Sequence, residues 1–231
     1  MSLCQSSESS CGACCGIFNL DYPREQIKKI LKERTEYFED TVDYSRRETV
    51  ISFREVFEKK ESTYPKKDHT IYNCPFLGYI NKDFTRIGCM IHPIRTGDPK
   101  SQNFSFYGSS ICQTYDCRNK DRKNGMDWED YFNSLKLDFY DYSHLASDHI
   151  LITRLESFFD SLQIPLKDIF LKHSPLLKRI FQYKVNQMNH LTSFEIDMNS
   201  NTGTPFERLI EILSLEPDHP LYLELKLFCK E

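Results

Sequence analysis

The stretch Cys11-Gly12-Ala13-Cys14-Cys15-Gly16 decides how this sequence is interpreted. Cys11 and Cys14 are separated by two residues (C-x2-C), the shortest spacing that lets one loop direct two sulfur atoms to one metal ion. The neighbouring glycines relax the backbone, because glycine accepts positive φ and leaves amides free to point at sulfur. Cys15 adjoins Cys14, so the two side chains diverge. The stretch predicts a loop that binds metal through thiolates.

The other cysteines lie mostly in the first half of the chain, and all nine except Cys229 precede residue 118. The N-terminal residues have neither the basic region nor the apolar run of an export signal. An odd number of cysteines in a chain of 231 residues without such a signal argues against a disulfide framework. It favours metal binding or redox chemistry in a reducing compartment. We therefore expect a cytoplasmic protein.

Composition and motifs exclude several classes of function. The chain has 34 acidic and 30 basic residues, a formal net charge of −4, so the basic excess typical of nucleic-acid binding is absent. Its apolar stretches fall short of the roughly 20 residues that a membrane-spanning helix needs. No G-x-G fingerprint or P-loop is present. We expect partners that are neither nucleic acid nor membrane.

Seven thiols are candidate metal ligands. They are Cys11, Cys14, Cys15, Cys74, Cys89, Cys112 and Cys117. One tetrahedral zinc accepts four, so three arrangements stay open: one iron–sulfur cluster with spare thiols, two metals, or one zinc with several structural cysteines. Cys4 and Cys229 have no supporting context and are expected to be independent buried thiols. His92 follows Cys89 at C-x2-H spacing and is either a further ligand or an ordinary hydrogen-bonded histidine.

Three segments in succession carry a resemblance to a known family. They are Cys11 to Gly16, then Cys74-Pro75-Phe76-Leu77, then Gly88-Cys89-Met90-Ile91-His92-Pro93-Ile94-Arg95. This order resembles the YkgJ-type family of CxxCxxCC zinc- or iron-chelating domains over roughly residues 8–117. The resemblance implies that Cys11, Cys14, Cys15, Cys74 and Cys89 are ligands, with Cys112 and Cys117 as a closing pair. The leading cysteine of the family is replaced here by Glu8.

The reaction, if the protein has one, is not readable from these residues, and no catalytic residue is assigned. The first hypothesis is a metal-binding protein that holds an iron–sulfur cluster or zinc, with the thiol surplus favouring the cluster. Because the family includes flagellin lysine N-methylases, the resemblance also implies a metal-dependent protein-modifying enzyme with an unknown protein substrate. A structural-zinc interaction domain is the third hypothesis. A redox C-x2-C pair would need a preceding strand, whereas residues 5–10 are polar and rich in serine.

The sequence predicts an α+β fold with two parts. Residues 1–120 are a cysteine-rich metal-chelating region of turns and short strands, and residues 121–231 are a packed helical C-terminal region. Predicted helices cover about 23–38, 127–139, 144–162 and 166–183, and a capping box at Thr204 begins another. A strand is predicted over 50–57 and a polar loop over 190–203, while 221–228 fits either a strand or a helix. His144 and His149 are expected at the surface.

Overall fold

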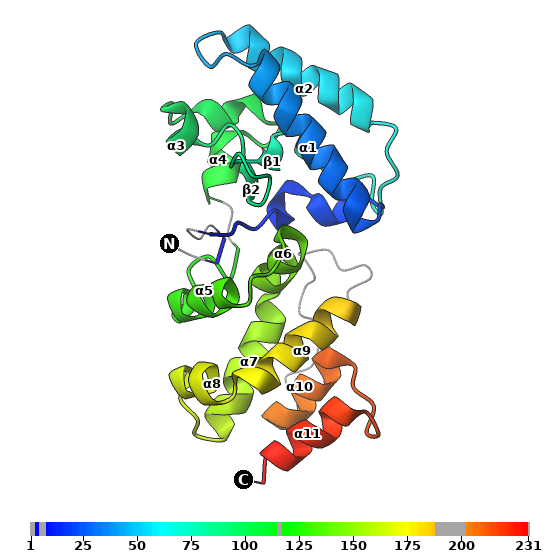
Figure 1. The fold of residues 1–231 in the computed structure, drawn as a ribbon, viewed down its shortest axis with the longest axis vertical. Helices are drawn as coiled ribbons and strands as arrows, with labels where there is room; N and C mark the ends of the chain where they lie inside the picture. The colour runs from blue at the N-terminus through cyan, green and yellow to red at the C-terminus, as the bar shows by residue number, and fades with distance from the viewer. Residues whose placement is uncertain (1–2, 5–7, 115–116, 188–201, 231) are drawn as a thin grey trace.

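The computed structural model describes residues 3–4, 8–114, 117–187 and 202–230. Figure 1 shows an elongated molecule in which α1–α4 form one half and α5–α11 the other, with the N-terminal segment running between them. The described residues are mostly helical and contain one two-stranded antiparallel sheet. The predicted α+β class is confirmed at this coarse level.

The first half contains α1 (Arg24–Thr41), α2 (Arg47–Glu61), β1 (Leu77–Tyr79), β2 (Ile87–Cys89), α3 (Pro93–Thr96) and α4 (Gly108–Thr114). Short 3-10 turns add Ala13–Cys15, Ile17–Asn19 and Ser101–Phe104. The second half contains α5 (Gly125–Ser134), α6 (Phe139–Ser147), α7 (His149–Ser161), α8 (Leu166–Lys172), α9 (Ser174–Gln187), α10 (Pro205–Leu213) and α11 (Pro220–Phe228). The predicted boundary at residue 120 falls in the connector between α4 and α5.

The predicted strand over 50–57 is wrong, because these residues belong to helix α2. Val50, Phe53 and Phe57 recur at helical spacing and are buried, whereas Ile51 and Val56 between them are 38% and 40% exposed. A buried stripe at positions i, i+3 and i+7 is the signature of an amphipathic helix. The helix predicted over 23–38 is confirmed as α1, which continues to Thr41.

An aromatic cluster joins this helical pair to the cysteine-bearing segments. The Phe38 ring meets that of Phe53 edge-on at 4.9 Å between centroids, and Phe53 stacks on Phe76 at 5.4 Å. All three side chains are buried, together with Cys74 and Met90. The first half therefore has a small apolar core of its own, directly beside the thiols.

The two strands form a short hairpin that lies against α1. Gly78 faces Gly88 across the ladder, and Leu77 pairs with Cys89. A Cβ atom at Gly78 would lie 2.6 Å from the Met90 sulfur and 2.7 Å from the Thr35 hydroxyl, so glycine is required for this close approach. The pairing places Cys89 opposite Leu77, which follows Cys74 by three residues.

Two long helices predicted in the second half are each divided in the structure. Residues 144–162 belong to α6 and α7, and the break falls at Asp148, whose side chain accepts the Leu151 amide at 2.9 Å and starts α7. Residues 166–183 are likewise divided into α8 and α9. A carboxylate that caps a new helix competes with continuation of the preceding one. The apolar periodicity alone did not reveal these breaks.

The helix predicted from Asp127 to Phe139 is also shorter than expected. It begins at Gly125, so Asp127 lies in its first turn rather than at its cap, and it ends at Ser134. Lys136 takes a positive φ of 51°, which ends the helical path before Phe139 opens α6.

The start of α10 confirms the predicted capping box. The Thr204 hydroxyl accepts the Glu207 amide at 3.2 Å, and the Glu207 carboxylate accepts the Thr204 amide at 2.7 Å. The ambiguous segment 221–228 is helical and belongs to α11. Of the predicted polar loop over 190–203, residues 190–201 lie outside the described residues.

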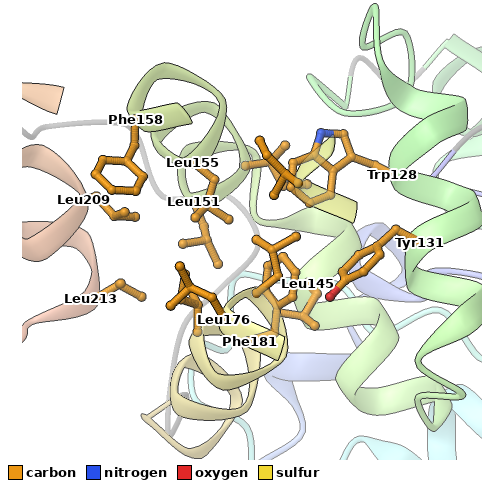
Figure 2. Packing of buried hydrophobic residues seen from close by; sticks show 14 of the residues in the cluster. Trp128, Tyr131, Leu145, Leu151, Leu155, Phe158, Leu176, Phe181, Leu209 and Leu213 are labelled. Atoms are coloured by element: carbon orange, nitrogen blue, oxygen red, sulfur yellow. The ribbon is translucent and has the colours of Figure 1, made fainter. Parts of the chain in front are cut away.

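The helices of the second half enclose the larger core. Figure 2 shows Trp128 and Tyr131 of α5 packed towards the side chains of α7, α9 and α10, which face one another across the cluster. The Trp128 ring meets Phe181 at 6.1 Å and donates its Nε1 proton to Glu156 at 2.9 Å. In the described part of the chain, no helix is long and apolar enough to cross a bilayer.

The N-terminal segment connects the two halves. Leu3 is fully buried in the larger core, and its carbonyl accepts the Tyr142 hydroxyl at 3.0 Å. The Gly12 amide donates to the Ser143 hydroxyl at 3.0 Å. The cysteine-rich loop is therefore held on the surface of α6.

Candidate metal centre

The Cys11–Gly16 loop forms a tight 3-10 turn. The Cys15 amide donates to the Gly12 carbonyl at 3.1 Å, and the Gly16 amide donates to the Ala13 carbonyl at 2.9 Å. Gly16 has a φ of +81°, and a Cβ there would lie 2.5 Å from the Tyr72 carbonyl oxygen. Glycine is thus needed at this position both for backbone conformation and for space. The predicted loop is present.

Backbone and amide hydrogen bonds bring the Cys74 segment to this loop. The Cys74 amide donates to the Cys15 carbonyl at 3.0 Å. The Asn73 side chain donates to the Gly16 carbonyl at 2.6 Å and accepts from the Asn19 side chain at 2.8 Å. These bonds fix residues 73–74 to the Cys11–Gly16 loop, although more than fifty residues separate the two in sequence.

Cys14, Cys15 and Cys74 form a chain of hydrogen-bonded thiols. The Cys15 thiol bonds to both of the other sulfur atoms. These bonds, before burial, raise the pKa of Cys15 well above its usual value and lower the pKa of Cys14 and of Cys74. A hydrogen bond from the Phe76 amide and the nearby positive charge of Arg34 lower the pKa of Cys74 further. Cys14 and Cys74 are the sulfurs best prepared to ionise.

Cys89 and Cys112 lie on the other side of Cys74. The Cys89 sulfur accepts the Gln102 side-chain amide at 3.8 Å, and the Cys112 sulfur is 3.5 Å from the Ser105 hydroxyl. Burial raises the pKa of Cys89 to about 12, and the charge of Cys74 adds to the effect. Burial raises the pKa of Cys112, and the charges of Cys74 and Cys14 raise it further.

Cys4 belongs with the other thiols, contrary to the expectation from sequence. Its carbonyl accepts the Cys11 amide at 2.9 Å. Burial, and then the charges of Cys14 and Cys117, raise the pKa of Cys4 to about 12. Burial and the charges of Cys4, Cys14 and Cys117 also raise the pKa of Cys11. Cys229 alone stands apart, exposed just beyond α11.

Three of the thiols share a local arrangement. The sulfur of Cys11 accepts the amide of Ala13, two residues further on, at 3.5 Å. The Phe76 amide serves Cys74 in the same way, and the Ile91 amide serves Cys89. Amide donors to sulfur stabilise the thiolate and tune the metal centres that thiolates build. In three segments that are distant in sequence, the cysteine sulfur thus accepts the backbone amide two residues further on.

Arg34 is a residue of this region that the sequence analysis missed. Its guanidinium donates to the carbonyls of Cys74 at 3.1 Å and Leu77 at 3.0 Å, and it pairs with Glu61 at 2.7 and 2.5 Å. Arg34 is 1% exposed and Glu61 is 3% exposed. The sequence signal is a charge on the apolar stripe of a helix, since Arg34 lies on the same buried face of α1 as Leu31 and Phe38.

The histidines do not join the thiols. The Nδ1 atom of His92 accepts the Ile94 amide at 3.2 Å and caps α3, which favours the ordinary hydrogen-bonded role over ligation. His144 was expected at the surface, but it is 3% exposed, with its ring stacked on Phe18 at 3.7 Å. His149 is half-buried, and its Nε2 atom lies 3.2 Å from Arg118.

The thiols gather in one region without closing on a common point. Within residues 3–4, 8–114, 117–187 and 202–230, no group of three or more His, Cys, Asp or Glu side chains is arranged to hold a metal ion. All nine cysteines are free thiols. No family model, curated protein or solved structure matches the chain. The resemblance to the YkgJ-type family stays a prediction that depends on the cysteine segments alone.

Proposed function

We propose that this protein binds a thiophilic metal centre, an iron–sulfur cluster or zinc, through the cysteines of its first half. The observation that carries the proposal is the gathering of eight thiols, from residues 4 to 117, around the Cys11–Gly16 loop. Free cysteine is often buried singly in protein cores, but burial alone does not require eight thiols to meet. Metal binding through thiolates gives a reason for this gathering.

The chemistry of the donor set fits such a centre. Thiolate sulfur suits zinc, copper(I) and iron–sulfur clusters rather than magnesium or calcium. Amide donors already stand at Cys11, Cys74 and Cys89, and the positive charge of Arg34 acts on Cys74. These groups offset part of the negative charge that several thiolates would bring into a buried site.

Metal binding would change the protonation of these thiols. Burial raises the pKa of Cys4 and of Cys89 to about 12, so both are neutral near pH 7. The Cys15 thiol hydrogen-bonds to the sulfur atoms of Cys14 and Cys74. A metal would displace the protons of the thiols that it binds.

Two wider hypotheses remain within this proposal. A metal-dependent protein-modifying enzyme, acting on an unknown protein substrate, would need an open coordination position. A structural-zinc interaction domain would need a closed site of four thiolates. Free thiols persist in reducing compartments, so we propose a cytoplasmic location. The net charge of −4 supports a partner other than nucleic acid.

A second candidate function is thiol–disulfide exchange by Cys15 and Cys74. The hydrogen bond between their sulfurs, together with the lowered pKa of Cys74, favours it. Such a pair would cycle between two thiols and one disulfide with an external thiol or disulfide as co-reactant. Thiol counting before and after mild oxidation separates the two functions, because a metal-bound pair is protected whereas a redox pair loses two thiols.

Anaerobically purified protein is expected to contain zinc or iron, and Cys74→Ser is expected to lose at least half of it. The serine hydroxyl is a poor ligand for a soft metal, and the Cys74 thiol hydrogen-bonds to Cys15 while its charge acts on Cys89 and Cys112. Metal analysis and visible absorbance provide the measurement, since iron–sulfur clusters are coloured and zinc is not. The matched control is Cys229→Ser, an exposed thiol, which should keep the full metal content. Metal-free wild-type protein would refute the proposal.

Metal affinity is expected to rise with pH. Thiols with a raised pKa are protonated near neutral pH, so each one that becomes a ligand releases a proton. Lowering the pH by one unit should weaken binding by about tenfold for each proton released. A zinc competition titration between pH 6 and pH 8 measures this slope. An affinity that does not change over that range would show that these thiols are not the ligands.

A further inference from the structure

The thiols divide into two groups around the Cys11–Gly16 loop. We infer that they form two four-sulfur metal sites rather than one, which deepens the proposed function and rests on it. We define the N-terminal set as Cys4, Cys11, Cys14 and Cys117, and the sheet set as Cys15, Cys74, Cys89 and Cys112. Each set supplies the four thiolates that one tetrahedral zinc or one iron–sulfur cluster takes.

Hydrogen bonds hold the sheet set together. Cys15 and Cys74 are joined twice, by the backbone bond of 3.0 Å and by their thiols. The hairpin connects Cys89 to the Cys74 segment, because the Met90 amide donates to the Phe76 carbonyl at 2.9 Å. The 3-10 turn Ser101–Phe104 then reaches both remaining thiols, since Gln102 contacts Cys89 and neighbouring Ser105 contacts Cys112.

Helix α6 holds the N-terminal set together. The Cys11 thiol donates to the Ser143 carbonyl of α6 at 3.6 Å, and the Cys11 amide donates to the Cys4 carbonyl. The Asn119 side chain donates to the Ala146 carbonyl at 2.9 Å, which places the connector bearing Cys117 on the same helix. Ser143 and Ala146 are three residues apart, so the two attachments lie roughly 4.5 Å apart along the axis. In Figure 1 the N-terminal segment and this connector lie together between the two halves.

The vicinal pair explains why there are two sets. Cys15 turns towards Cys74 through both its carbonyl and its thiol. Cys14 shares the C-x2-C loop with Cys11, and its charge acts on Cys4 and Cys11. Cys14 also hydrogen-bonds to Cys15 and acts on Cys74 and Cys112, so it lies between the sets.

The test uses the full chain with zinc as the probe, added anaerobically to chelator-treated protein. The wild type is expected to bind two zinc ions per chain. Cys117→Ser removes a thiol of the N-terminal set and Cys89→Ser one of the sheet set, so each is expected to bind one ion and the double variant none. Cys4→Ser should match Cys117→Ser, whereas Cys229→Ser should still bind two. Far-UV circular dichroism checks that each variant is folded.

A second measurement uses only the wild type. Alkylation at one zinc equivalent, mapped by mass spectrometry, is expected to show protection of four cysteines that all belong to one set. Protection of a mixed group such as Cys11 with Cys74 would overturn the division. Loading with ferrous iron and sulfide tests whether the sets take clusters instead, and the same pattern among the variants is expected.

The outcomes separate this inference from the proposed function. One metal centre per chain that is lost in both Cys89→Ser and Cys117→Ser would overturn the two sites and leave thiolate metal binding intact. Zinc content that is unchanged in Cys4→Ser would remove Cys4 from the N-terminal set and overturn its four-sulfur site. Wild-type protein that binds neither zinc nor iron would overturn the proposed function itself.

Discussion

Replacing Arg34 with methionine is expected to lower the free energy of unfolding by about 3–5 kcal/mol. The change leaves the carboxylate of Glu61 buried without its partner and removes the donors to the carbonyls of Cys74 and Leu77. Removing one member of a buried ion pair is costly because the other charge stays in a medium of low polarity. Urea unfolding monitored by circular dichroism measures the loss.

Two variants show whether the buried pair is the cause. Lys60→Met breaks the pair with Glu33, whose side chains are 40% and 51% exposed, and should cost at most about 1 kcal/mol. The double variant Arg34→Met, Glu61→Leu removes both charges and should recover part of the stability. Recovery should be incomplete, since the two carbonyls still lack donors. A loss in Arg34→Met no larger than in Lys60→Met would refute this account.

His144 is expected to make the protein sensitive to acid. Burial, and then the charges of Lys67, Arg24 and Lys184, lower its pKa to about 3, while the opposing charge of Asp138 raises it. The unfolded chain takes up a proton below about pH 6.5 and the folded chain does not, so stability falls as the pH falls. The histidine therefore lowers the free energy of unfolding by about 2.3 kcal/mol between pH 6.5 and pH 4.5.

Replacing this histidine with phenylalanine tests the effect. Among the described residues, neither ring nitrogen of His144 has a hydrogen-bond partner, and its ring already stacks on Phe18. Removing an unpaired buried polar group should stabilise the fold at pH 7 by about 1–3 kcal/mol, and the advantage should widen at pH 4.5. Urea unfolding at both pH values measures the gap, with His144→Leu as a smaller alternative and exposed His69→Gln as the control. Equal pH slopes in wild type and His144→Phe would contradict it.

Local signals predicted the parts of the fold that depend on local chemistry. The capping box at Thr204 fixed the start of α10, and Pro23 marked the start of α1. The division of the segment over 144–162 was missed because apolar spacing continues through it, and only the geometry of Asp148 shows the break. Helix α2 was missed because Val50 and Ile51 are β-branched and favour a strand when considered without their surroundings.

The sequence indicated which thiols to consider, but not how they are arranged in space. The C-x2-C loop and the turns at Cys74 and Cys89 led to the prediction of a thiol site. The place of Cys4 depends on its backbone bond to Cys11 and on charges from distant segments, which spacing does not encode. The partner of Arg34 lies 27 residues away on another helix, so the pair becomes visible only when both helices are in place.

The bond between Gly12 and Ser143 spans 131 residues, which sets the order of events during synthesis. At roughly 5–20 residues per second, the ribosome makes the intervening chain in about 7–26 s. During this time the thiol-bearing loop has left the exit tunnel, but the helix that anchors it does not yet exist. Until Ser143 has been made, the loop therefore lacks this anchor.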